Sequence, residues 1–313
     1  MDGVVIIDKP SGKTSHDVVT EVKRLLKVRK AGHAGTLDPL ATGVLPVLLN
    51  EGTKLAPFLM STTKEYRAAA LLGVSTDTLD VTGTVVETSP VNVSADDVIR
   101  AIHGLYGVRK QTPPLYSAVK FKGRSLHRWA RKGVVIVPEA REVEIFHAEV
   151  VAINLPEVVF TVSCSKGTYI RSLCADIGEE LGCGATLSSL RRTKNGSFAE
   201  NDALSLAGLE DGEKKRFLEE RLIPVAEAVS GLKAINIDDL LADRMRNGCQ
   251  LMSNEVEHDH ISFLAVGDMV RLLSPQGGLV AIVEIIGNNG EETASGDVRQ
   301  LARTLRVFGV YNG

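Results

Sequence analysis

The segment from Gly32 to Leu45 contains the residue whose type and setting best suit it to chemistry, Asp38. Three glycines in this segment allow a tight loop that approaches a ligand closely, and Pro39 disfavours helical geometry at the residue before it. We therefore expect Asp38 on a shaped, accessible loop, where an ionised carboxylate can act as a nucleophile. An aspartate before a proline is also a common turn former, and the residue types alone leave both interpretations open.

No pattern in the sequence has the spacing of a metal site or a dithiol redox site. The four cysteines lie far apart, without the paired Cys-x-x-Cys spacing that such sites need: Cys164, Cys174, Cys183 and Cys249. His258 and His260 flank Asp259, but this segment is typical of a solvated loop and has no further ligand framework. We expect buried, reduced thiols, and neither a metal nor another cofactor.

Charge is unevenly distributed along the chain. The net charge is −3, which argues weakly against a nucleic-acid partner. However, residues 22–37 contain five basic residues and residues 115–137 contain six, with no acidic residue in either segment. Acidic residues gather instead at 200–220 and 255–259. The basic segments could follow RNA phosphates or could be solvated faces, and charge alone does not decide between them.

Local patterns predict the elements that hold the Asp38 loop. Thr14 with Asp17, and Ser94 with Asp97, form capping-box patterns that start two amphipathic helices. Alternating or continuous apolar runs predict strands at Val4–Ile7, Val44–Leu49, Glu65–Leu72, Thr84–Glu87, Val143–Ile153 and Val158–Cys164.

The second half of the chain contains two further helical segments and a β-rich tail. A helix is predicted from the turn at residues 165–168 to about Leu181, with Tyr169 and Arg171 near its N-terminus. The stretch from Ala203 to Ala228 is predicted to be helical. Beyond residue 230, strands are predicted at Asp268–Leu273, Leu279–Ile286 and Leu305–Tyr311. The length of 313 residues favours two domains, the second small and β-rich.

A series of spaced motifs runs through the first 200 residues or so, beginning at Lys9. Together they resemble the bacterial tRNA pseudouridine-55 synthase (TruB) family, whose active-site motif matches the Asp38 segment. The further matching motifs are Lys9-Pro10-Ser11-Gly12 with Thr14-Ser15, Lys64-Glu65-Tyr66, Thr76-Asp77-Thr78 with Asp80 and Gly83, Gln111-Thr112-Pro113-Pro114 with Ser117-Ala118-Val119-Lys120, Lys166-Gly167-Thr168-Tyr169-Ile170-Arg171, and Leu190-Arg191-Arg192.

The resemblance implies a catalytic role for three residues. In the family the aspartate of this segment is the nucleophile, which corresponds to Asp38. Arg171 resembles the arginine that pairs with it, and Tyr66 resembles the tyrosine that stacks on the extruded uracil. The reaction breaks the N-glycosidic bond, rotates the uracil and rejoins it through C5, without metal, redox change or external energy. Attack at C1′ and attack at C6 both remain open.

Other matched positions are implied in binding the RNA. His33 resembles the histidine that takes the space left by the flipped uridine, Tyr169 the residue beneath the base, and Leu190 a residue of the uracil pocket. Without the resemblance, these would be interpreted as a capping or turn histidine, a half-buried strand tyrosine and a core leucine. The basic candidates for substrate binding are Lys9, Lys64, Lys120, Arg124 and Arg131.

The resemblance also implies a domain organisation. Residues 1–230 would form an α+β catalytic domain, with a mixed, mostly antiparallel sheet, flanking helices and a basic, thumb-like insertion at residues 115–138 that grips the T-stem-loop. Residues 233–313 resemble a small β-barrel PUA domain that reaches the acceptor stem. Two positions depart from the family pattern, since His127 stands where relatives commonly carry tyrosine and Ala34 where many carry threonine.

The sequence therefore predicts a cytoplasmic tRNA pseudouridine synthase that acts as a monomer, without guide RNA or membrane attachment. One alternative is a non-catalytic factor that binds and folds tRNA, for which Asp38 would have no use. Another is the related guide-RNA-dependent synthase, in which partners supply the grip that the thumb-like insertion provides here.

Overall fold

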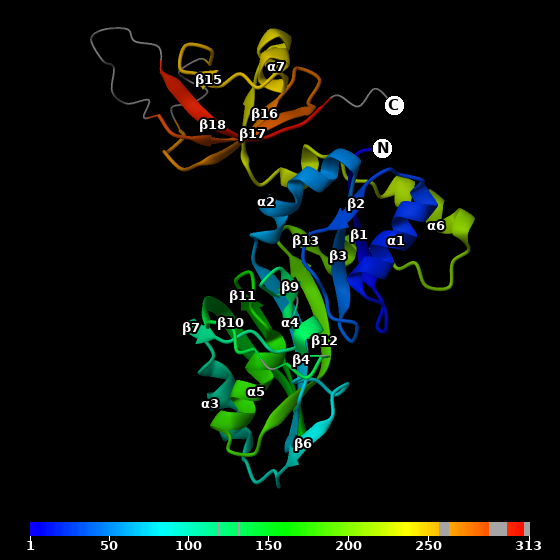
Figure 1. Cartoon of the computed structure of the whole chain (residues 1–313), viewed down its shortest axis with the longest axis vertical. Coiled ribbons are helices and arrows are strands. Elements are labelled where there is room, and N and C mark those ends of the chain that lie inside the picture. The colour runs from blue at the N-terminus through cyan, green and yellow to red at the C-terminus, as the bar shows by residue number, and fades with distance from the viewer. Residues whose placement is uncertain (118, 131, 135, 257–262, 288–298, 310–313) are drawn as a thin grey trace.

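The computed structural model describes residues 1–117, 119–130, 132–134, 136–256, 263–287 and 299–309. Figure 1 shows an elongated molecule with one β-sheet in its main body and a second, smaller sheet at the end formed by the C-terminal part of the chain. Helices and loops flank the large sheet. None of the helices in these described ranges has the length and apolar character needed to span a bilayer.

The large sheet forms the centre of the main body. Its only parallel pair among the described residues is β12 with β3, and the other neighbours are antiparallel, as the sequence predicted for the fold class. In spatial order the strands are β1 (Gly3–Lys9), β3 (Thr42–Leu49), β12 (Ala185–Asn195), β4 (Lys64–Leu72), β11 (Glu157–Cys164), β10 (Arg141–Asn154) and β7 (Gly107–Gln111), with β2 (Ala31–His33) on β3 and β13 (Phe198–Ala199) on β12.

Three helices each contribute several side chains to one apolar core with the large sheet, and the helix at Asp211–Glu220 adds Leu218. The three are α1 (Ser15–Leu26), α3 (Ala95–His103) and α5 (Ile170–Glu180). The predicted capping boxes of α1 and α3 are present, so each N-cap hydroxyl accepts from the backbone N–H three residues later. The smaller elements around them are α2 (Ala56–Met60), η1 (Asn50–Leu55), η2 (Glu200–Asp202), η3 (Glu227–Val229), β5 (Val74–Thr76) and β6 (Val85–Thr88).

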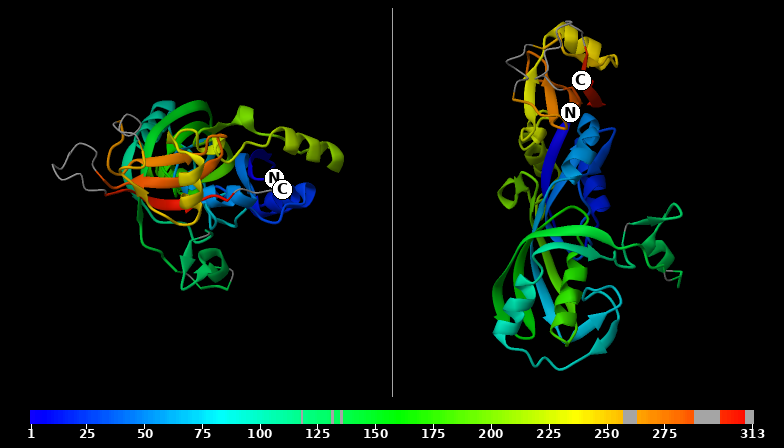
Figure 2. Two further views of the ribbon diagram at one scale, coloured as in Figure 1. Left: turned by 90° about the horizontal axis from the view of Figure 1, so that it is seen from above. Right: turned by 90° about the vertical axis from the view of Figure 1, so that its left-hand side faces the viewer.

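The predicted thumb-like insertion stands away from the sheet. It contains the short hairpin β8 (Lys120–Phe121) and β9 (Arg124–Ser125), followed by α4 (Leu126–Ala130). Figure 2 shows this part projecting sideways from the main body. The Arg124 guanidinium lies 5.8 Å from the centre of the Trp129 ring. The insertion therefore presents basic and aromatic groups to the surroundings.

The helix predicted between Ala203 and Ala228 is wrong at both ends, because α6 covers only Asp211–Glu220. The flanking segments pair with strand β1 instead. Leu204 donates its N–H to the carbonyl of Ile6, and Ile223 exchanges two backbone hydrogen bonds with Val4. Tertiary pairing with the edge of β1 overrides the local helical pattern there.

In the described part of the chain the smaller sheet has five strands, and the helix α7 (Asp239–Arg246) packs against it. In spatial order its strands are β14 (Lys233–Asn236), β16 (Met269–Leu273), β17 (Leu279–Ile285), β18 (Gln300–Val307) and β15 (Leu251–Met252). The hairpin predicted around residues 274–278 is present between β16 and β17. The last predicted strand was placed too late, since β18 begins at Gln300 and ends at Val307. The apolar Phe308 that extended the predicted strand is buried in the core just after it, and Tyr311 lies outside the described residues.

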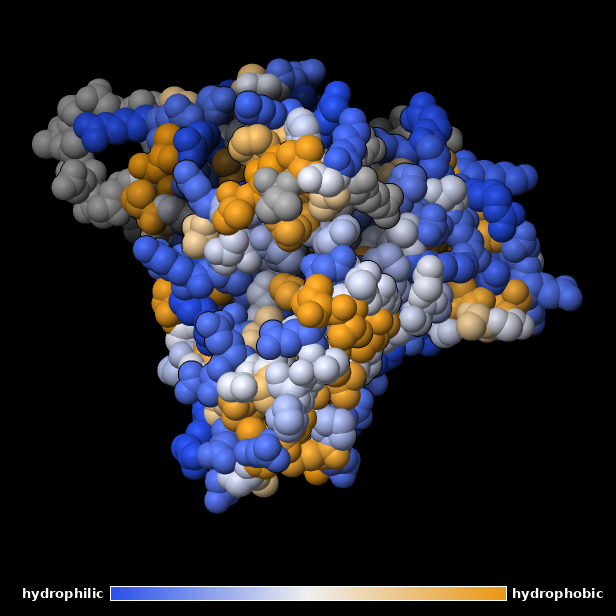
Figure 3. All heavy atoms as spheres, turned by 60° about the horizontal axis from the view of Figure 1, so that its bottom comes forward, coloured by the Kyte–Doolittle hydropathy of each residue, from blue (hydrophilic) through white to orange (hydrophobic). Residues whose placement is uncertain are grey.

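A second apolar core joins the two sheets. Val4, Ile6 and Leu48 of the main body pack in one cluster with Ile282 and Phe308 of the smaller sheet. The two parts are thus connected by more than their linker. On the surface, Figure 3 shows a face where hydrophilic side chains surround scattered apolar patches. The prediction of buried thiols holds for three cysteines, but Cys249 is exposed.

Candidate active site

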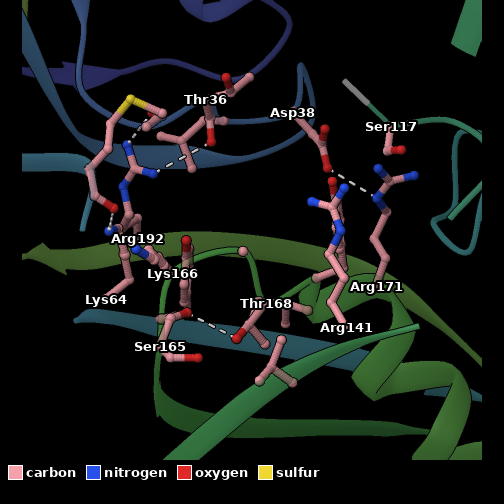
Figure 4. Close-up of a pocket in the computed structure, with 18 of the residues that line it drawn as sticks. Thr36, Asp38, Lys64, Ser117, Arg141, Ser165, Lys166, Thr168, Arg171 and Arg192 are labelled. Atoms are coloured by element: carbon pink, nitrogen blue, oxygen red, sulfur yellow. Dashed lines mark hydrogen bonds and ion pairs between the residues drawn. The ribbon is translucent and has the colours of Figure 1, made fainter. Parts of the chain in front are cut away.

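A cleft of about 590 Å³ opens on the large sheet beside Asp38. Its walls come from the loop that links β2 to β3, the start of β4, the turn before α5, and β12. Figure 4 shows Asp38 with Arg171 at one end of this cleft and Arg192 with Lys64 at the other. The lining is both charged and apolar, and it brings together Asp38, Lys64, Tyr66, Tyr169, Arg171 and Leu190 from the sequence prediction.

The loop that carries Asp38, residues 34–41, is held by hydrogen bonds along its length. Gly35 has a φ of +105°, which a residue with a side chain rarely adopts. The loop carbonyls accept hydrogen bonds from side chains of three other segments and from one N–H of the loop itself. The donors are Asn195 to the carbonyl of Ala34, Arg192 to those of Gly35 and Thr36, Ser15 to that of Leu37, the N–H of Ala41 to that of Asp38, Lys9 to that of Pro39, and Ser11 to that of Leu40. The loop is therefore a fixed support for the carboxylate.

Asp38 pairs with Arg171 across the cleft. The carboxylate Oδ2 lies 3.0 Å from Nε of the guanidinium, and Figure 4 shows the two side chains pointing toward each other. The Asp38 side chain is 40% exposed, whereas the Arg171 side chain is only 4% exposed. The arginine is itself fixed, because its terminal nitrogens donate to the carbonyls of Thr78 (2.7 Å) and Tyr116 (2.9 Å). The pair thus consists of an accessible carboxylate and an immobilised, buried cation.

Asp80 is a second acid beside Arg171, and the sequence interpretation gave it no role of its own. It is buried, and its carboxylate lies 3.8 Å from the guanidinium. Its other oxygen accepts hydrogen bonds from the Thr78 hydroxyl and from the backbone and hydroxyl of Thr82. Because these bonds hold Asp80 in place, the arginine has a fixed negative neighbour behind it as well as Asp38 in front.

Tyr66, Leu190 and Tyr169 contribute the apolar part of the cleft. Tyr66 on β4 and Leu190 on β12 are both buried. Burial raises the pKa of the Tyr66 hydroxyl, so it stays protonated near neutral pH. Tyr169 is the residue before α5, and Gln111 anchors it by accepting from its N–H (2.7 Å) and donating to its carbonyl. Burial raises the pKa of Tyr169 as well.

The two predicted lysines nearest the site are both buried. Lys9 donates to the carbonyls of Pro10 (2.8 Å), Lys13 (2.6 Å) and Pro39 (3.3 Å), which uses all three of its N–H groups. It does not line the cleft, so this geometry assigns it to the support of the loop rather than to a bound ligand. Lys64 lines the cleft and donates to two backbone carbonyls. Burial lowers the pKa of each ammonium to about 8.

The remaining predicted residues that the structure describes lie outside the cleft. His33 is on β2, and its Nδ1 is buried without a hydrogen-bond partner among the described residues. Burial, and next the Arg192 guanidinium, lower its pKa below the usual 6.5. Lys120 and Arg124 are on the thumb-like hairpin, and Arg131 lies outside the described residues.

Sequence reasoning missed the central strand β12 and the role of its side chains. The run from Ala185 to Asn195 contains two register shifts, which break the alternation that marks a strand. Arg192 and Asn195 were therefore not expected to reach the Asp38 loop, although the motif at residues 190–192 was the available signal. Among the described residues no group of three or more His, Cys, Asp or Glu side chains could hold a metal, and the segment 258–260 lies outside them.

Comparison with known families gives two matches that together span most of the main body. Residues 23–170 match the model of the TruB family pseudouridylate synthase N-terminal domain. Residues 171–230 match the tRNA pseudouridylate synthase B C-terminal domain. The two matches meet between Ile170 and Arg171, which both line the cleft.

Relatives with curated names extend over nearly the whole chain. The chain is 49% identical to tRNA pseudouridine synthase B of Syntrophus aciditrophicus, over 98% of this chain and 99% of that protein. It is 42% identical to tRNA pseudouridine synthase B of Geobacter sulfurreducens, over 98% of this chain and 100% of that protein.

Solved structures share the fold. A Cbf5-Nop10-Gar1 complex contains a chain that matches with a TM-score of 0.73 and 31% identity, covering 98% of this chain and 85% of that one. A chain in an H/ACA RNP bound to a substrate RNA containing 2'-deoxyuridine matches with a TM-score of 0.72 and 28% identity, with the same coverage.

Proposed function

Because the chain belongs to the TruB family of pseudouridylate synthases, we propose that it isomerises one T-loop uridine of tRNA, U55, to pseudouridine, with Asp38 as nucleophile. Pseudouridine synthesis on tRNA is the activity for which its relatives are named. The observation that carries the assignment of Asp38 is its position: a 40% exposed carboxylate, 3.0 Å from a buried guanidinium, on a loop whose carbonyls from residue 34 to residue 40 all accept hydrogen bonds. Such a carboxylate can reach a ligand without losing its orientation.

The reaction can proceed with the groups that the cleft supplies. The bond between N1 of uracil and C1′ breaks, the base turns, and a bond forms between C5 and C1′, while C5 loses a proton and N1 gains one. Attack of Asp38 on C1′ or on C6 would give a covalent intermediate, and both routes end with the carboxylate released. Oxidation state does not change, so no electron acceptor is needed.

The apolar residues suit an extruded base. A uridine must leave its stack for its glycosidic bond to be reached, and extruded bases are held by stacking on aromatic side chains. In this proposal Tyr66 stacks on the uracil and Leu190 and Tyr169 complete the pocket, which is supported by the fact that all three line the cleft. The volume of about 590 Å³ is large enough for one nucleotide. In this proposal His33 occupies the space that the uridine leaves in the T-loop.

Basic groups outside the cleft support a larger RNA footprint. Lys120 and Arg124 of the thumb-like insertion would follow the backbone of the T-stem. A second groove, of about 610 Å³, lies between α2 and β18 and is lined by three cations, Lys30, Lys54 and Arg306. Pro57 of α2 borders both the cleft and this second groove. The smaller sheet, as a PUA domain, would thus bring the acceptor stem alongside the T-stem.

Two features favour a stand-alone enzyme over the alternatives. The relatives that match nearly end to end are named tRNA pseudouridine synthase B. Their sequence identity to this chain is higher than that of the chains found in the Nop10 and H/ACA assemblies. The thumb-like insertion also supplies a grip within the chain. We therefore propose a cytoplasmic monomer that works without guide RNA or cofactor.

The site of modification can be mapped directly. An unmodified tRNA transcript is incubated with the protein alone, treated with a carbodiimide that marks pseudouridine, and read by primer extension. A single stop at the T-loop uridine is expected. Binding of the transcript without any stop would point to a tRNA-folding factor, and a stop that requires added guide RNA would point to a guide-dependent enzyme.

A further inference from the structure

Arg192 is a buried cation whose partners in the described part of the chain are not carboxylates. Its side chain is among the largest that are fully buried, with 1% of the residue exposed. Nε donates to the carbonyl of Val44 at 2.7 Å, Nη2 to that of Gly35 at 3.0 Å, and Nη1 makes a longer contact of 3.5 Å with that of Thr36. Burying a charge is unfavourable unless its donors are used, so three backbone acceptors on one guanidinium indicate a built arrangement.

The acceptors of Arg192 lie on both sides of Asp38. Gly35 and Thr36 precede the nucleophile, and Val44 follows it on β3. One planar guanidinium therefore ties both ends of the Asp38 loop to strand β12. Glycines permit this close approach: a Cβ at Gly35 would lie 3.3 Å from Nη1 of the arginine.

Gly43 shows the same fit from the other side of the loop. Its φ is +98°, and a Cβ there would lie 2.2 Å from the carbonyl oxygen of Arg192, closer than two atoms can pack. The glycine next to the loop is thus required by the backbone of the same arginine. Strands β3 and β12 therefore pack too closely at Gly43 for any side chain to fit.

Arg192 also contacts the residue on the other side of the proposed uridine site. It is the cross-strand partner of Tyr66 in the pairing of β12 with β4, and both residues line the cleft. Burial raises the pKa of the Tyr66 hydroxyl, and the charge of the nearby Arg192 guanidinium opposes that rise. Figure 4 shows Arg192 reaching toward Thr36 from the strand below. A single residue thus bonds to the support of the nucleophile and is the strand neighbour of the tyrosine proposed to stack on the base.

We propose that Arg192 is a positioning residue for the isomerisation, which holds the Asp38 loop and Tyr66 at a fixed separation around the flipped uridine. The proposal rests on the proposed function, because it assumes that the nucleophile and the tyrosine act on the same base. Arg192 itself takes no part in bond making. Its substitution should slow the chemical step while the affinity for tRNA stays the same, since the residue is almost fully buried.

The test compares Arg192→Gln and Arg192→Lys with a matched control, Arg191→Gln. Arg191 is the neighbouring residue on β12, but its guanidinium pairs with Asp8 and Glu200, outside the cleft. Single-turnover rates are measured by tritium release from C5-labelled tRNA with enzyme in saturating excess. Dissociation constants for the same tRNA are measured by filter binding, and folding is checked by circular dichroism.

We expect Arg192→Gln to lower the single-turnover rate on the order of 10²-fold, the usual effect of misplacing a reacting group by about 1 Å. Its dissociation constant should stay within about two-fold of the wild type. Arg192→Lys keeps the buried charge but loses the planar fork, so it should fold and still be slowed, which keeps the test decisive if the glutamine variant does not fold. Arg191→Gln should react at the wild-type rate.

Two results would overturn the proposal. A folded Arg192→Lys variant with the wild-type rate would show that the fork is not needed to position the loop. A variant that loses rate and affinity together would show that Arg192 contacts the RNA instead. Inactivity of the wild-type protein is a separate outcome, since it would contradict the proposed function and not only the role of Arg192.

Discussion

Replacing Arg171 with methionine should separate what this residue does for folding from what Asp38 does for chemistry. Methionine keeps an unbranched apolar stem but removes the guanidinium. The change leaves the carbonyls of Thr78 and Tyr116 without their donor and leaves the buried Asp80 carboxylate without its cation. Removing one partner from a buried ion pair destabilises a protein by about 3–5 kcal/mol.

The other half of the pair should contribute little to stability. The Asp38 side chain is 40% exposed, and exposed ion pairs are worth at most about 1 kcal/mol. For a domain of this size, each kcal/mol shifts the melting temperature by roughly 2–4 °C. Arg171→Met should therefore lower Tm by roughly 6–20 °C, and Asp38→Asn by at most about 4 °C.

The assay combines calorimetric melting with single-turnover tritium release, run well below the Tm of each variant. Arg171→Met should slow release on the order of 10²-fold, because the carboxylate loses its fixed partner. Arg100→Met is the control, since that arginine is exposed and pairs only on the surface of α3. These roles of Arg171 and Asp38 are contradicted if Arg171→Met melts and reacts like the wild type, or if Asp38→Asn lowers Tm as much as Arg171→Met does.

Three further predictions concern pH and RNA binding. Folding lowers the pKa of His33, so as the pH falls the unfolded chain takes up a proton before the folded protein does, and the stability of the fold decreases. The Tm of His33→Gln should therefore fall less than the Tm of the wild type between about pH 7 and about pH 5. An equal fall in Tm for both proteins would contradict this. Reversing the charge of Lys120 and Arg124 should weaken T-arm hairpin binding and reduce its salt dependence by about 0.7–0.9 per lost phosphate contact, and an unchanged slope in filter binding would exclude a phosphate role. Reversing Lys30 and Arg306 should weaken binding of full-length tRNA but not of the T-arm hairpin, and equal loss on both RNAs would argue against an acceptor-stem contact.

The sequence was most informative where local chemistry and structure agree. Capping boxes at Thr14 and Ser94 are short-range signals, and both helices begin where those residues predict. The hairpin between β16 and β17 is likewise encoded by its own turn residues. The resemblance predicted that Arg171 pairs with Asp38, and the two side chains lie 3.0 Å apart.

The rest of the site depends on contacts between distant segments. Strand β12 lacks a regular pattern, yet its Arg192 and Asn195 satisfy the loop more than 150 residues away in the chain. Lys9 is a residue type that commonly binds phosphate, but its ammonium group donates hydrogen bonds to three backbone carbonyls instead. Sequence alone cannot show which basic side chains are buried and form hydrogen bonds within the fold.

The packing between the two sheets affects how the contribution of the smaller sheet to RNA binding should be tested. Because Ile282 and Phe308 share a core with Val4 and Ile6, deletion after residue 230 would expose apolar surface on the main body. An activity assay of such a truncated chain on a T-arm hairpin would therefore test folding as well as binding. Surface substitutions in the second groove avoid this difficulty.

The central claim is that Asp38 carries out uridine isomerisation on tRNA without help from other factors. It is tested most directly with a tRNA transcript labelled with tritium at uridine C5, incubated with the wild type or with Asp38→Asn and without guide RNA or metal. We predict release of tritium by the wild type and none by a folded Asp38→Asn variant that still binds the tRNA. Release at the same rate by both proteins, or by neither while the tRNA stays bound, would contradict the claim.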